Sequence, residues 1–391
     1  MTILDAPAAT RWTAQWKELY EEVITTGLCT GCAGCVVTCP HDVIGYEHEE
    51  GKYVPFHLEE ELGPTDCIHG VKGCTTCTRA CPRFRAWEPA ADIHLFGRAR
   101  EPDEMAGIWR QLLLTRATDE RQQEVGQDGG FVSAMLIWLL EHDYIEAAMV
   151  SGVEPDDAWK ARPVLVHNAE EVLATAGSRY TYCANPLALR DAKAQGLSRL
   201  ALVGMGCQTS SPPVMWDRKA GKVSRPFLFN IGLLCSKTFD DAIFAELFEA
   251  KYGLVKSEMV KMNIKGVFQI WMRDGSYHEI DLKECHHWTR QGCVHCPDFA
   301  AEHSDIATGG IGVDNDWTLT IVRSELGEEV ITRMINDHTI LARPAQQDDK
   351  AMKLLRTLSI VSRRRWPDTA DPAPKIGVPP PKKKTAPPTP T

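Results

Sequence analysis

Apolar residues follow two different periods along the middle of the chain, and the change from one to the other predicts strands and helices in turn. Short apolar runs of strand length are followed by stretches in which apolar positions recur every three or four residues. The expected strands cover residues 112–114, 147–150, 200–203, 227–233 and 319–322, and the expected helices cover residues 129–140, 170–176, 240–251 and 327–335. Gly253 follows the third helix as a C-cap would. This order predicts an α/β sheet with helices on its faces.

Two further elements lie outside this alternation. Residues 10–26 predict one amphipathic helix, because apolar side chains recur there at helical spacing. The apolar face of this helix carries Trp12, Trp16, Leu19 and Val23. Residues 268–272 and 277–280 flank Asp274-Gly275 and predict a hairpin inserted late in the domain.

Composition narrows the class of protein. With 391 residues, of which 43% are hydrophobic, the chain can bury a full core and form two ordered domains. The net charge of −10 argues against a nucleic-acid partner. The longest apolar run, residues 131–140, is far shorter than the roughly 20 residues that span a bilayer, so we expect a buried helix there. The N-terminus lacks the apolar stretch of a signal peptide, and we therefore expect a cytoplasmic protein.

Beyond residue 369 the composition shifts to Pro, Lys and Thr, which predicts a disordered tail. The lysines of this tail could contact an acidic partner or an anionic membrane surface. A solvated chain end is the simpler interpretation.

Eight of the 14 cysteines form two near-repeats in the first 81 residues. The first repeat is Cys29-x2-Cys32-x2-Cys35-x3-Cys39-Pro40, and the second is Cys67-x6-Cys74-x2-Cys77-x3-Cys81-Pro82. In a C-x2-C-x2-C-x3-C-P run three thiolates bind one cubane and the fourth binds the other cluster. We therefore predict a bacterial-ferredoxin-like module with two 4Fe-4S clusters.

The pairing of the repeats assigns the ligands. The first cluster should take Cys29, Cys32, Cys35 and Cys81, and the second should take Cys39, Cys67, Cys74 and Cys77. Cys67 is the loosest assignment, because six residues rather than two separate it from Cys74. Structural zinc and a disulfide framework are the alternatives, and the prolines after both fourth cysteines favour the clusters. Thiolate ligands also need a reducing compartment.

Two glycine-containing loops mark candidate sites in the second domain. Gln127-Asp128-Gly129-Gly130 enters a predicted helix, where backbone N–H groups could hold a phosphate, although a plain turn would look the same. Gly204-Met205-Gly206-Cys207-Gln208 follows a predicted strand, at the carboxyl end where α/β proteins bind ligands. A third cysteine group, outside the repeats, predicts another metal centre. It consists of Cys207, Cys235, Cys285 and the Cys293-x2-Cys296 pair.

Four motifs together resemble the coenzyme F420 hydrogenase/dehydrogenase β-subunit family. In order, they are Gly126-Gln127-Asp128-Gly129-Gly130-Phe131-Val132-Ser133-Ala134, Gly204-Met205-Gly206-Cys207-Gln208, Ile231-Gly232-Leu233-Leu234-Cys235, and Cys293-Val294-His295-Cys296-Pro297-Asp298-Phe299 with Ser304-Asp305-Ile306-Ala307-Thr308-Gly309-Gly310. The similarity covers roughly residues 106–340. With the leading cysteine repeats, the whole chain is most similar to the F subunits of F420H2 dehydrogenases within that family.

The resemblance implies FAD in the α/β domain, coenzyme F420 docking against it as substrate, and a third 4Fe-4S cluster beside it. Its implied ligands are Cys207, Cys235, Cys293 and Cys296, with Cys285 as the substitute for Cys235. The implied activity is hydride transfer between F420 and FAD, with single electrons passing through the clusters to or from a redox partner such as a ferredoxin, a hydrogenase or another oxidoreductase subunit. FAD can take a hydride and release electrons one at a time, so no protein group is expected to act as nucleophile or base.

Cationic and polar side chains near these motifs are candidates for cofactor contacts. Arg179, within Ser178-Arg179-Tyr180, could pair with a flavin phosphate or with the acidic deazaflavin tail, and Lys265 is a similar candidate. An ordinary surface role is the alternative for both. Two other functions also remain open: reduction of an unsaturated ring such as a tetrapyrrole, and a non-catalytic electron-relay subunit.

These interpretations divide the chain into five parts. We expect an N-terminal helix (1–25), a ferredoxin-like domain (26–90), a linker (91–105), an FAD- and deazaflavin-binding α/β domain with the third cluster (106–345), and a tail (346–391) that is disordered beyond about residue 369.

Overall fold

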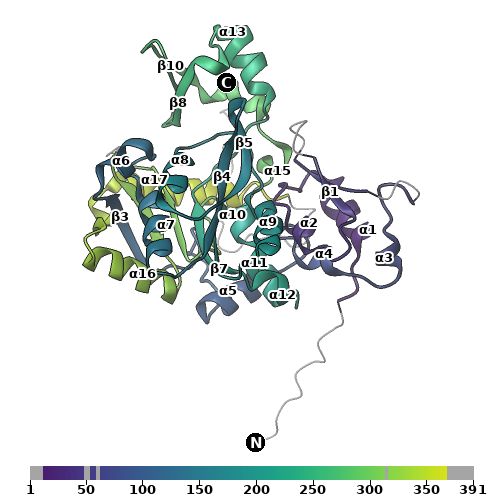
Figure 1. Ribbon diagram of the computed structural model, residues 1–391. Coiled ribbons are helices and arrows are strands. Elements are labelled where there is room, and N and C mark those ends of the chain that lie inside the picture. Colours follow the sequence, from purple (N-terminus) through teal and green to yellow (C-terminus); the bar gives the residue numbers. More distant parts are fainter. Residues whose placement is uncertain (1–11, 48–52, 59–61, 313–315, 368–391) are drawn as a thin grey trace, which may run out of the picture.

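The computed structural model describes residues 12–47, 53–58, 62–312 and 316–367. Its centre is an eight-stranded sheet in the order β13-β3-β12-β11-β7-β6-β4-β5 (Figure 1). The strands are β3 (Gln111–Ala117), β4 (Ala147–Glu154), β5 (Asp157–Val166), β6 (Leu200–Met205), β7 (Phe227–Leu233), β11 (Ile306–Gly309), β12 (Thr318–Val322) and β13 (Ile340–Pro344). The four central neighbours β11, β7, β6 and β4 run parallel, and the remaining pairs are antiparallel.

Helices cover both faces of this sheet, and strand alternation decides which side chains meet which helices. In β6, Ala201 and Val203 face a core that includes α7 (Phe131–Glu141) and α16 (Glu325–Asn336). Leu200 and Leu202 point to the opposite face, toward α9 (Leu189–Ala194) and α11 (Ser211–Asp217). On that same face, farther along the sheet, α17 (Asp349–Arg363) packs through Leu355 against side chains of β3. The predicted α/β sheet with helices on its faces is confirmed.

The N-terminal module packs against one side of the large domain (Figure 1). It contains α1 (Trp16–Leu19), η1 (Tyr20–Ile24), α2 (Gly34–Thr38), β1 (Ile44–Tyr46), β2 (Pro55–His57), α3 (Ile68–Val71) and α4 (Thr76–Arg79). The predicted first helix is confirmed over Trp16–Ile24, where Trp16, Leu19 and Val23 are buried. Trp12 precedes the helix and donates from its indole nitrogen to the Thr78 hydroxyl at 2.8 Å.

The core of the module continues into the large domain. Tyr182, Cys207 and Trp366 belong to the same apolar cluster as Trp16. The buried Arg218 guanidinium, at the end of α11, donates to backbone carbonyls of the module, including that of Cys81 at 3.0 Å. A shared core and buried hydrogen bonds of this kind fix the cysteine repeats relative to the sheet.

A small antiparallel sheet stands apart from the large one, at the top of Figure 1. It comprises β8 (Met259–Ile264), β9 (Val267–Met272) and β10 (Tyr277–Asp281), and it packs against η4 (Phe244–Glu249), which continues into α13 (Ala250–Tyr252). The hairpin at Asp274-Gly275 is confirmed, with Gly275 at a φ of +86°. The helix predicted over 240–251 begins later, at Phe244, and ends at Gly253 as expected.

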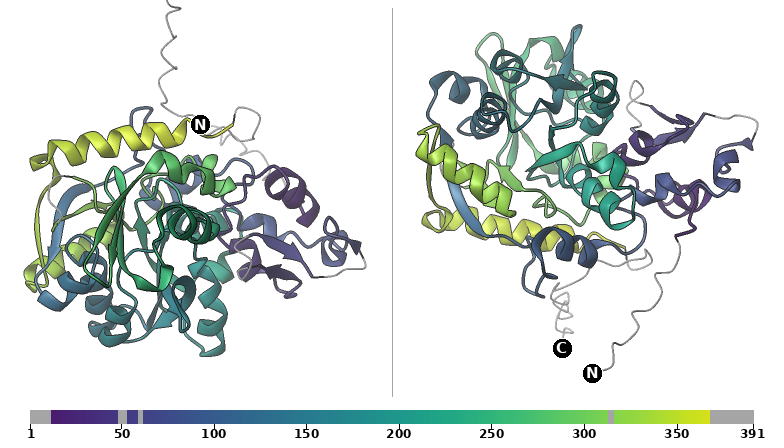
Figure 2. Two further views of the ribbon diagram at one scale, coloured as in Figure 1. Left: turned by 90° about the horizontal axis from the view of Figure 1, so that it is seen from above. Right: turned by 60° about the horizontal axis from the view of Figure 1, so that its bottom comes forward.

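Two segments assigned to connections are helical. Residues 346–391 were expected to form a tail, but they contain α17, the long yellow helix of Figure 2. Trp366, after this helix, is buried. Asp348 caps α17 by accepting from the Ala351 amide at 2.8 Å, and the buried face repeats at Ala351, Leu355 and Ser359. The expected linker 91–105 contains most of α5 (Glu88–Phe96), which is held by buried ion pairs that periodicity does not reveal. The proposed disordered stretch beyond residue 369 lies outside the described residues.

Six strands of the structure were not predicted: β1, β2, β5, β8, β11 and β13. Across the four described ranges we find no helix with both the length and the apolar surface needed to cross a bilayer.

Candidate functional site

The first cavity of the N-terminal module is lined by the four cysteines that the repeats assign to one cluster, which we call the proximal quartet. They are Cys29, Cys32, Cys35 and Cys81. The cavity encloses about 360 Å³ free of protein atoms, part of it open to solvent. Left-handed backbone at Gly31 (φ +76°) and Ala33 (φ +60°) turns the loop so that successive sulfurs face the same space.

Free thiols in this cavity would stay protonated at neutral pH. Burial and the neighbouring Cys32 raise the pKa of Cys29 to about 11, and burial and Cys81 raise the pKa of Cys32 to about 12. A thiolate, rather than a thiol, binds metal, so the site becomes ionised only when a cationic group offsets the burial. Four buried cysteines around one space therefore suit an iron–sulfur cluster.

The second cavity is lined by the other four cysteines of the repeats, which we call the distal quartet. They are Cys39, Cys67, Cys74 and Cys77. The short helix α3 takes up the long gap between Cys67 and Cys74 and keeps Cys67 on the cavity wall. The structure thus places Cys67, the loosest assignment from the sequence, on the wall of the same cavity as Cys39, Cys74 and Cys77.

Neither cavity resembles a site for a single ion. Within the part of the chain that the structure describes, no three His, Cys, Asp or Glu side chains are arranged to hold one metal ion. The cysteines of each quartet instead surround a space, which suits a cluster whose four irons each take one thiolate.

A third group of cysteines gathers at the carboxyl edge of the parallel strands, and we call it the inner quartet. It consists of Cys207, Cys235, Cys293 and Cys296. The helix α10 (Gly206–Thr209) directly follows β6, and Cys207 is its second residue. Cys235 lies two residues beyond the end of β7. Burial, together with the other three cysteines of the inner quartet, raises the pKa of Cys235, which shows that the four lie close together.

Cys285 lies away from the inner quartet. Its thiol is buried in the apolar cluster of the small sheet and points to the Asp281 carbonyl at 3.8 Å. The sequence left Cys235 and Cys285 open as alternatives, and the structure brings Cys235 to the group.

The three quartets follow one another through the molecule. Burial and neighbouring thiols, Cys77 of the distal quartet among them, raise the pKa of Cys35. Burial, Cys296 and then Cys32 of the proximal quartet raise the pKa of Cys207. Arg83 lines the cavity of the proximal quartet and also contacts the Cys296 sulfur of the inner quartet, and members of all three quartets pack in one apolar cluster.

The predicted phosphate loop lies at the same edge of the sheet. β3 runs in the same direction as β7, because the intervening β12 is antiparallel to both β3 and β11. The chain after β3 passes through α6 (Glu120–Val125) to Gln127-Asp128-Gly129-Gly130, which enters α7. Gly130 is the N-cap of α7 and provides no side-chain cap, so the first N–H groups of an eleven-residue helix are available to an anion.

The backbone conformation of this loop also explains why glycines occupy it. Asp128, Gly129 and Gly130 have φ values of +45°, +87° and +72°. A Cβ atom on Gly129 would collide with the Asp316 carbonyl, and one on Gly130 with the Gln122 carbonyl. The turn interpretation is sufficient for the glycines themselves, and phosphate binding has to rest on the helix end.

Lys265 reaches the loop from the small sheet. Lys265 stands in the turn between β8 and β9, and Asp128 stands just before α7. The ammonium nitrogen of Lys265 lies 2.8 Å from Oδ1 of Asp128. Tyr180 lies nearby: its hydroxyl donates to Asn263 at 3.1 Å, and burial and the Asp128 carboxylate raise its pKa. The structure thus brings Asp128, Lys265 and Tyr180 together from three distant parts of the sequence.

The remaining predicted contacts are less directed. Arg179 donates to the carbonyls of Thr175 and Gly177 within its own loop, next to Ser178. Gly204 lies inside β6, and Gly206 begins α10, where a Cβ atom would collide with the Asp298 carboxylate.

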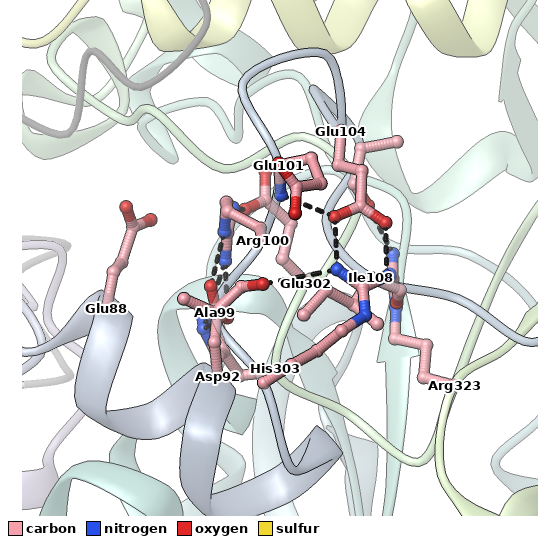
Figure 3. Close-up of polar contacts among 12 residues, drawn as sticks. Glu88, Asp92, Ala99, Arg100, Glu101, Glu104, Ile108, Glu302, His303 and Arg323 are labelled. Atoms are coloured by element: carbon pink, nitrogen blue, oxygen red, sulfur yellow. Dashed lines mark hydrogen bonds and ion pairs between the residues drawn. The ribbon is translucent and has the colours of Figure 1, made fainter.

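The sequence did not predict a buried network of charged side chains that includes the loop after Cys296. Arg100 forms a two-pronged pair with Asp92, with N–O distances of 2.6 and 2.8 Å, and also contacts Glu302 (Figure 3). His303 contacts Asp92 at 2.9 Å, and Arg363 of α17 joins Glu302 to Glu88 of α5. The network ties the loop that follows Cys296 to both helices. No periodic signal marks it, since its members lie in three separate segments.

Comparisons with known proteins agree with this architecture. Two family models for the "Coenzyme F420 hydrogenase/dehydrogenase, beta subunit" match the chain, the N-terminal model over residues 112–190 and the C-terminal model over residues 197–348. The chain is 29% identical to the coenzyme F420 hydrogenase β subunit of Methanothermobacter thermautotrophicus, over 70% of this chain and 99% of that protein. It is 26% identical to the F subunit of the F420H2 dehydrogenase from Methanosarcina mazei, over 83% of this chain and 87% of that protein.

A solved structure shows the same fold. A chain of the F420-reducing [NiFe] hydrogenase complex from Methanosarcina barkeri superposes with a TM-score of 0.64 at 26% identity, covering 67% of this chain and 91% of that chain. The two matched models together span most of the region between β3 and β13. The resemblance stated from the motifs is confirmed: the chain belongs to the coenzyme F420 hydrogenase/dehydrogenase β-subunit family.

Proposed function

We propose that this protein is an F420-linked oxidoreductase that transfers a hydride between coenzyme F420 and FAD and passes single electrons through three 4Fe-4S clusters to or from a partner protein. The observation that carries the proposal is the series of three cysteine quartets, inner, proximal and distal, leading away from the carboxyl edge of the sheet. The named relatives are subunits of F420-using hydrogenase and dehydrogenase complexes, which supports the same donor and a redox partner.

FAD would supply the step between two-electron and one-electron chemistry, because it exchanges hydride with one molecule and single electrons with another. The residues that would hold it lie at the sheet edge. The free N–H groups at the start of α7 suit its pyrophosphate, and Lys265 adds a positive charge beside them. Tyr180 and Asp128 would line the FAD site near Cys235.

Iron content tests the number of clusters, and two cysteines provide a matched pair. Anaerobically prepared protein should carry about twelve irons per chain. Cys235→Ala should lower this to about eight, whereas Cys285→Ala, which removes a buried thiol outside the quartets, should leave about twelve. A wild-type content of about eight that neither variant changes would remove the inner cluster.

Flavin analysis separates the proposed enzyme from a relay subunit. A chain that only relays electrons would hold iron without stoichiometric FAD. A chain that holds FAD but is reduced by its clusters, and not by reduced F420, would instead be a reductase of an organic ring.

A further inference from the structure

Arg83 lies at the junction between the proximal and inner quartets. It comes two residues after Cys81, lines the cavity of the proximal quartet, and is only 5% exposed. Its Nη2 atom donates to the sulfur of Cys296 in the inner quartet at 2.9 Å. One guanidinium therefore lies beside the proposed ligands of two clusters.

The charge of Arg83 has no carboxylate partner. Among the described residues no ion pair joins Arg83 to an acidic side chain, and its Nε atom has no hydrogen-bond partner. Its guanidinium lies over the ring of Trp366, 5.6 Å from the ring centre. A buried cation is costly unless negative charge offsets it, so the absence of a pair requires another source of negative charge.

Cluster-bound thiolates would supply that charge. Arg83 donates to the Cys296 sulfur of the inner quartet and lines the cavity that also holds Cys81 of the proximal quartet, so the ligands of both proposed clusters lie around its guanidinium. Two other buried arginines of this region differ from Arg83, because their terminal nitrogens donate to backbone carbonyls and not to a cysteine sulfur. Arg218 donates to the carbonyls of Thr78 and Cys81, and Arg290 donates to the carbonyl of Thr30 at 3.1 Å.

We propose that Arg83 sets the reduction potential of the inner cluster and favours electron transfer between the inner and proximal clusters. This inference rests on the proposed function. When the inner cluster takes one electron, its net charge falls by one and no proton or bond is exchanged. A fixed positive charge that donates a hydrogen bond to a ligand sulfur stabilises the reduced state more than the oxidised state, and so raises the potential.

Arg83 is thus a positioning residue for the Cys296 sulfur and a charge for the cluster, and it reaches no substrate in this account. Arg83 directly follows the Cys81-Pro82 pair. The loop that would supply a ligand to the proximal cluster would therefore also place a positive charge beside the inner cluster, so that a change in this loop would alter the reduction potentials of both clusters.

Redox titration followed by electron paramagnetic resonance tests this role. The inner cluster is identified as the signal that Cys235→Ala removes. In Arg83→Met the equilibrium constant for its one-electron reduction should fall about tenfold, a shift of about 59 mV to lower potential. Arg83→Lys keeps the charge but loses the planar donor group, and should recover part of the shift.

Arg85→Met is the matched control. Arg85 lies two residues further along, is partly exposed, and pairs with Glu22 at 2.6 Å, so its loss removes the same charge from the same module. It should leave the potential of the inner cluster unchanged. The iron content of each variant is measured first. If Arg83→Met loses iron, the potential of the inner cluster in Arg83→Lys is compared with that of the wild type instead.

Three results would overturn the inference: an unchanged potential in an iron-replete Arg83 variant, an equal shift in Arg85→Met, or a shift of the distal cluster alone. Failure of the proposed function looks different, since wild-type protein would then lack the signal that Cys235→Ala removes.

Discussion

Replacing Glu88 by glutamine should weaken the attachment of α17 to the rest of the protein. Glu88 stands in the first turn of α5, is 8% exposed, and accepts from both terminal nitrogens of Arg363 at 3.1 and 3.2 Å. Glutamine keeps the shape of the side chain and removes its charge. Arg363 then keeps its ion pair with Glu302.

The size of the effect follows from the pKa of Glu88. Burial alone raises this pKa, but the charges of Arg363 and Arg100 and the hydrogen bonds from Arg363 outweigh it and lower the pKa to about 2. The gap from the ordinary value of 4.5 corresponds to about 3 kcal/mol of stability. Breaking a buried ion pair by removing one partner typically costs about 3–5 kcal/mol, which is the same order.

The pH dependence has a definite sign. A carboxylate whose pKa is depressed in the folded protein contributes its stability in full above the unfolded value of 4.5, and loses it as the pH falls toward about 2. The difference between wild type and Glu88→Gln should therefore be constant from pH 7 to about 5, and should shrink below about 4.5.

Amide hydrogen exchange of the holoprotein measures this difference locally. Peptides covering residues 349–363 should exchange about a hundredfold faster in Glu88→Gln than in wild type at pH 7. The control is Glu328→Gln, because Glu328 pairs with Arg110 at 2.8 Å on the surface, where such pairs contribute about 0–1 kcal/mol. Equal exchange in the two variants, or a difference that grows as the pH falls, would refute the reasoning.

Three further predictions concern the flavin edge and the N-terminal module. Gly129→Val should destabilise the protein with or without FAD, because φ is +87° and the new side chain meets the Asp316 carbonyl. Lys265→Met should weaken FAD binding about tenfold in a flavin-release titration, and it should also lower the melting temperature, because it removes a cationic partner of the largely buried Asp128 carboxylate. Arg218→Met should leave buried module carbonyls without their donor, so peptides around Cys81 should exchange faster while β6 and β7 stay protected. Removing iron with a chelator should unfold residues 26–90 before the α/β domain, since eight cysteines of the module surround two cavities; unchanged amide protection without iron would contradict this.

Much of the architecture could be predicted because the physical signals are local. In β6 every residue is apolar and every second one faces the same helix layer, so the run from Leu200 to Val203 was sufficient to predict a buried strand. The cysteine repeats likewise have a spacing that geometry imposes. The structure places both sets around separate cavities, and the binding of clusters there stays a prediction.

The elements that were missed depend on distant partners. Helix α17 was missed although seven of its 15 residues are apolar, because the Pro- and Lys-rich composition after it extended the expected tail too far back. The Arg363 ion pairs and the buried Trp366, which join this segment to distant parts of the chain, left no signal in the sequence. The contact between Asp128 and Lys265 joins segments 137 positions apart in the sequence, which a single sequence cannot reveal. The choice between Cys235 and Cys285 was of the same kind, because only the folded positions distinguish the two thiols.

The central claim is that electrons pass from a deazaflavin through FAD to the clusters, and rapid mixing tests it most directly. Anaerobic, FAD-loaded protein is mixed with reduced F420 or with NADH, and flavin absorbance and cluster resonance signals are followed together. Reduced F420 should bleach the flavin and then reduce the clusters, while NADH acts slowly, because no G-x-G-x-x-G fingerprint follows any predicted strand. Cys29→Ala should leave flavin bleaching intact and stop electrons short of the distal cluster. Bleaching at equal rates by both donors, or by neither, would contradict the account.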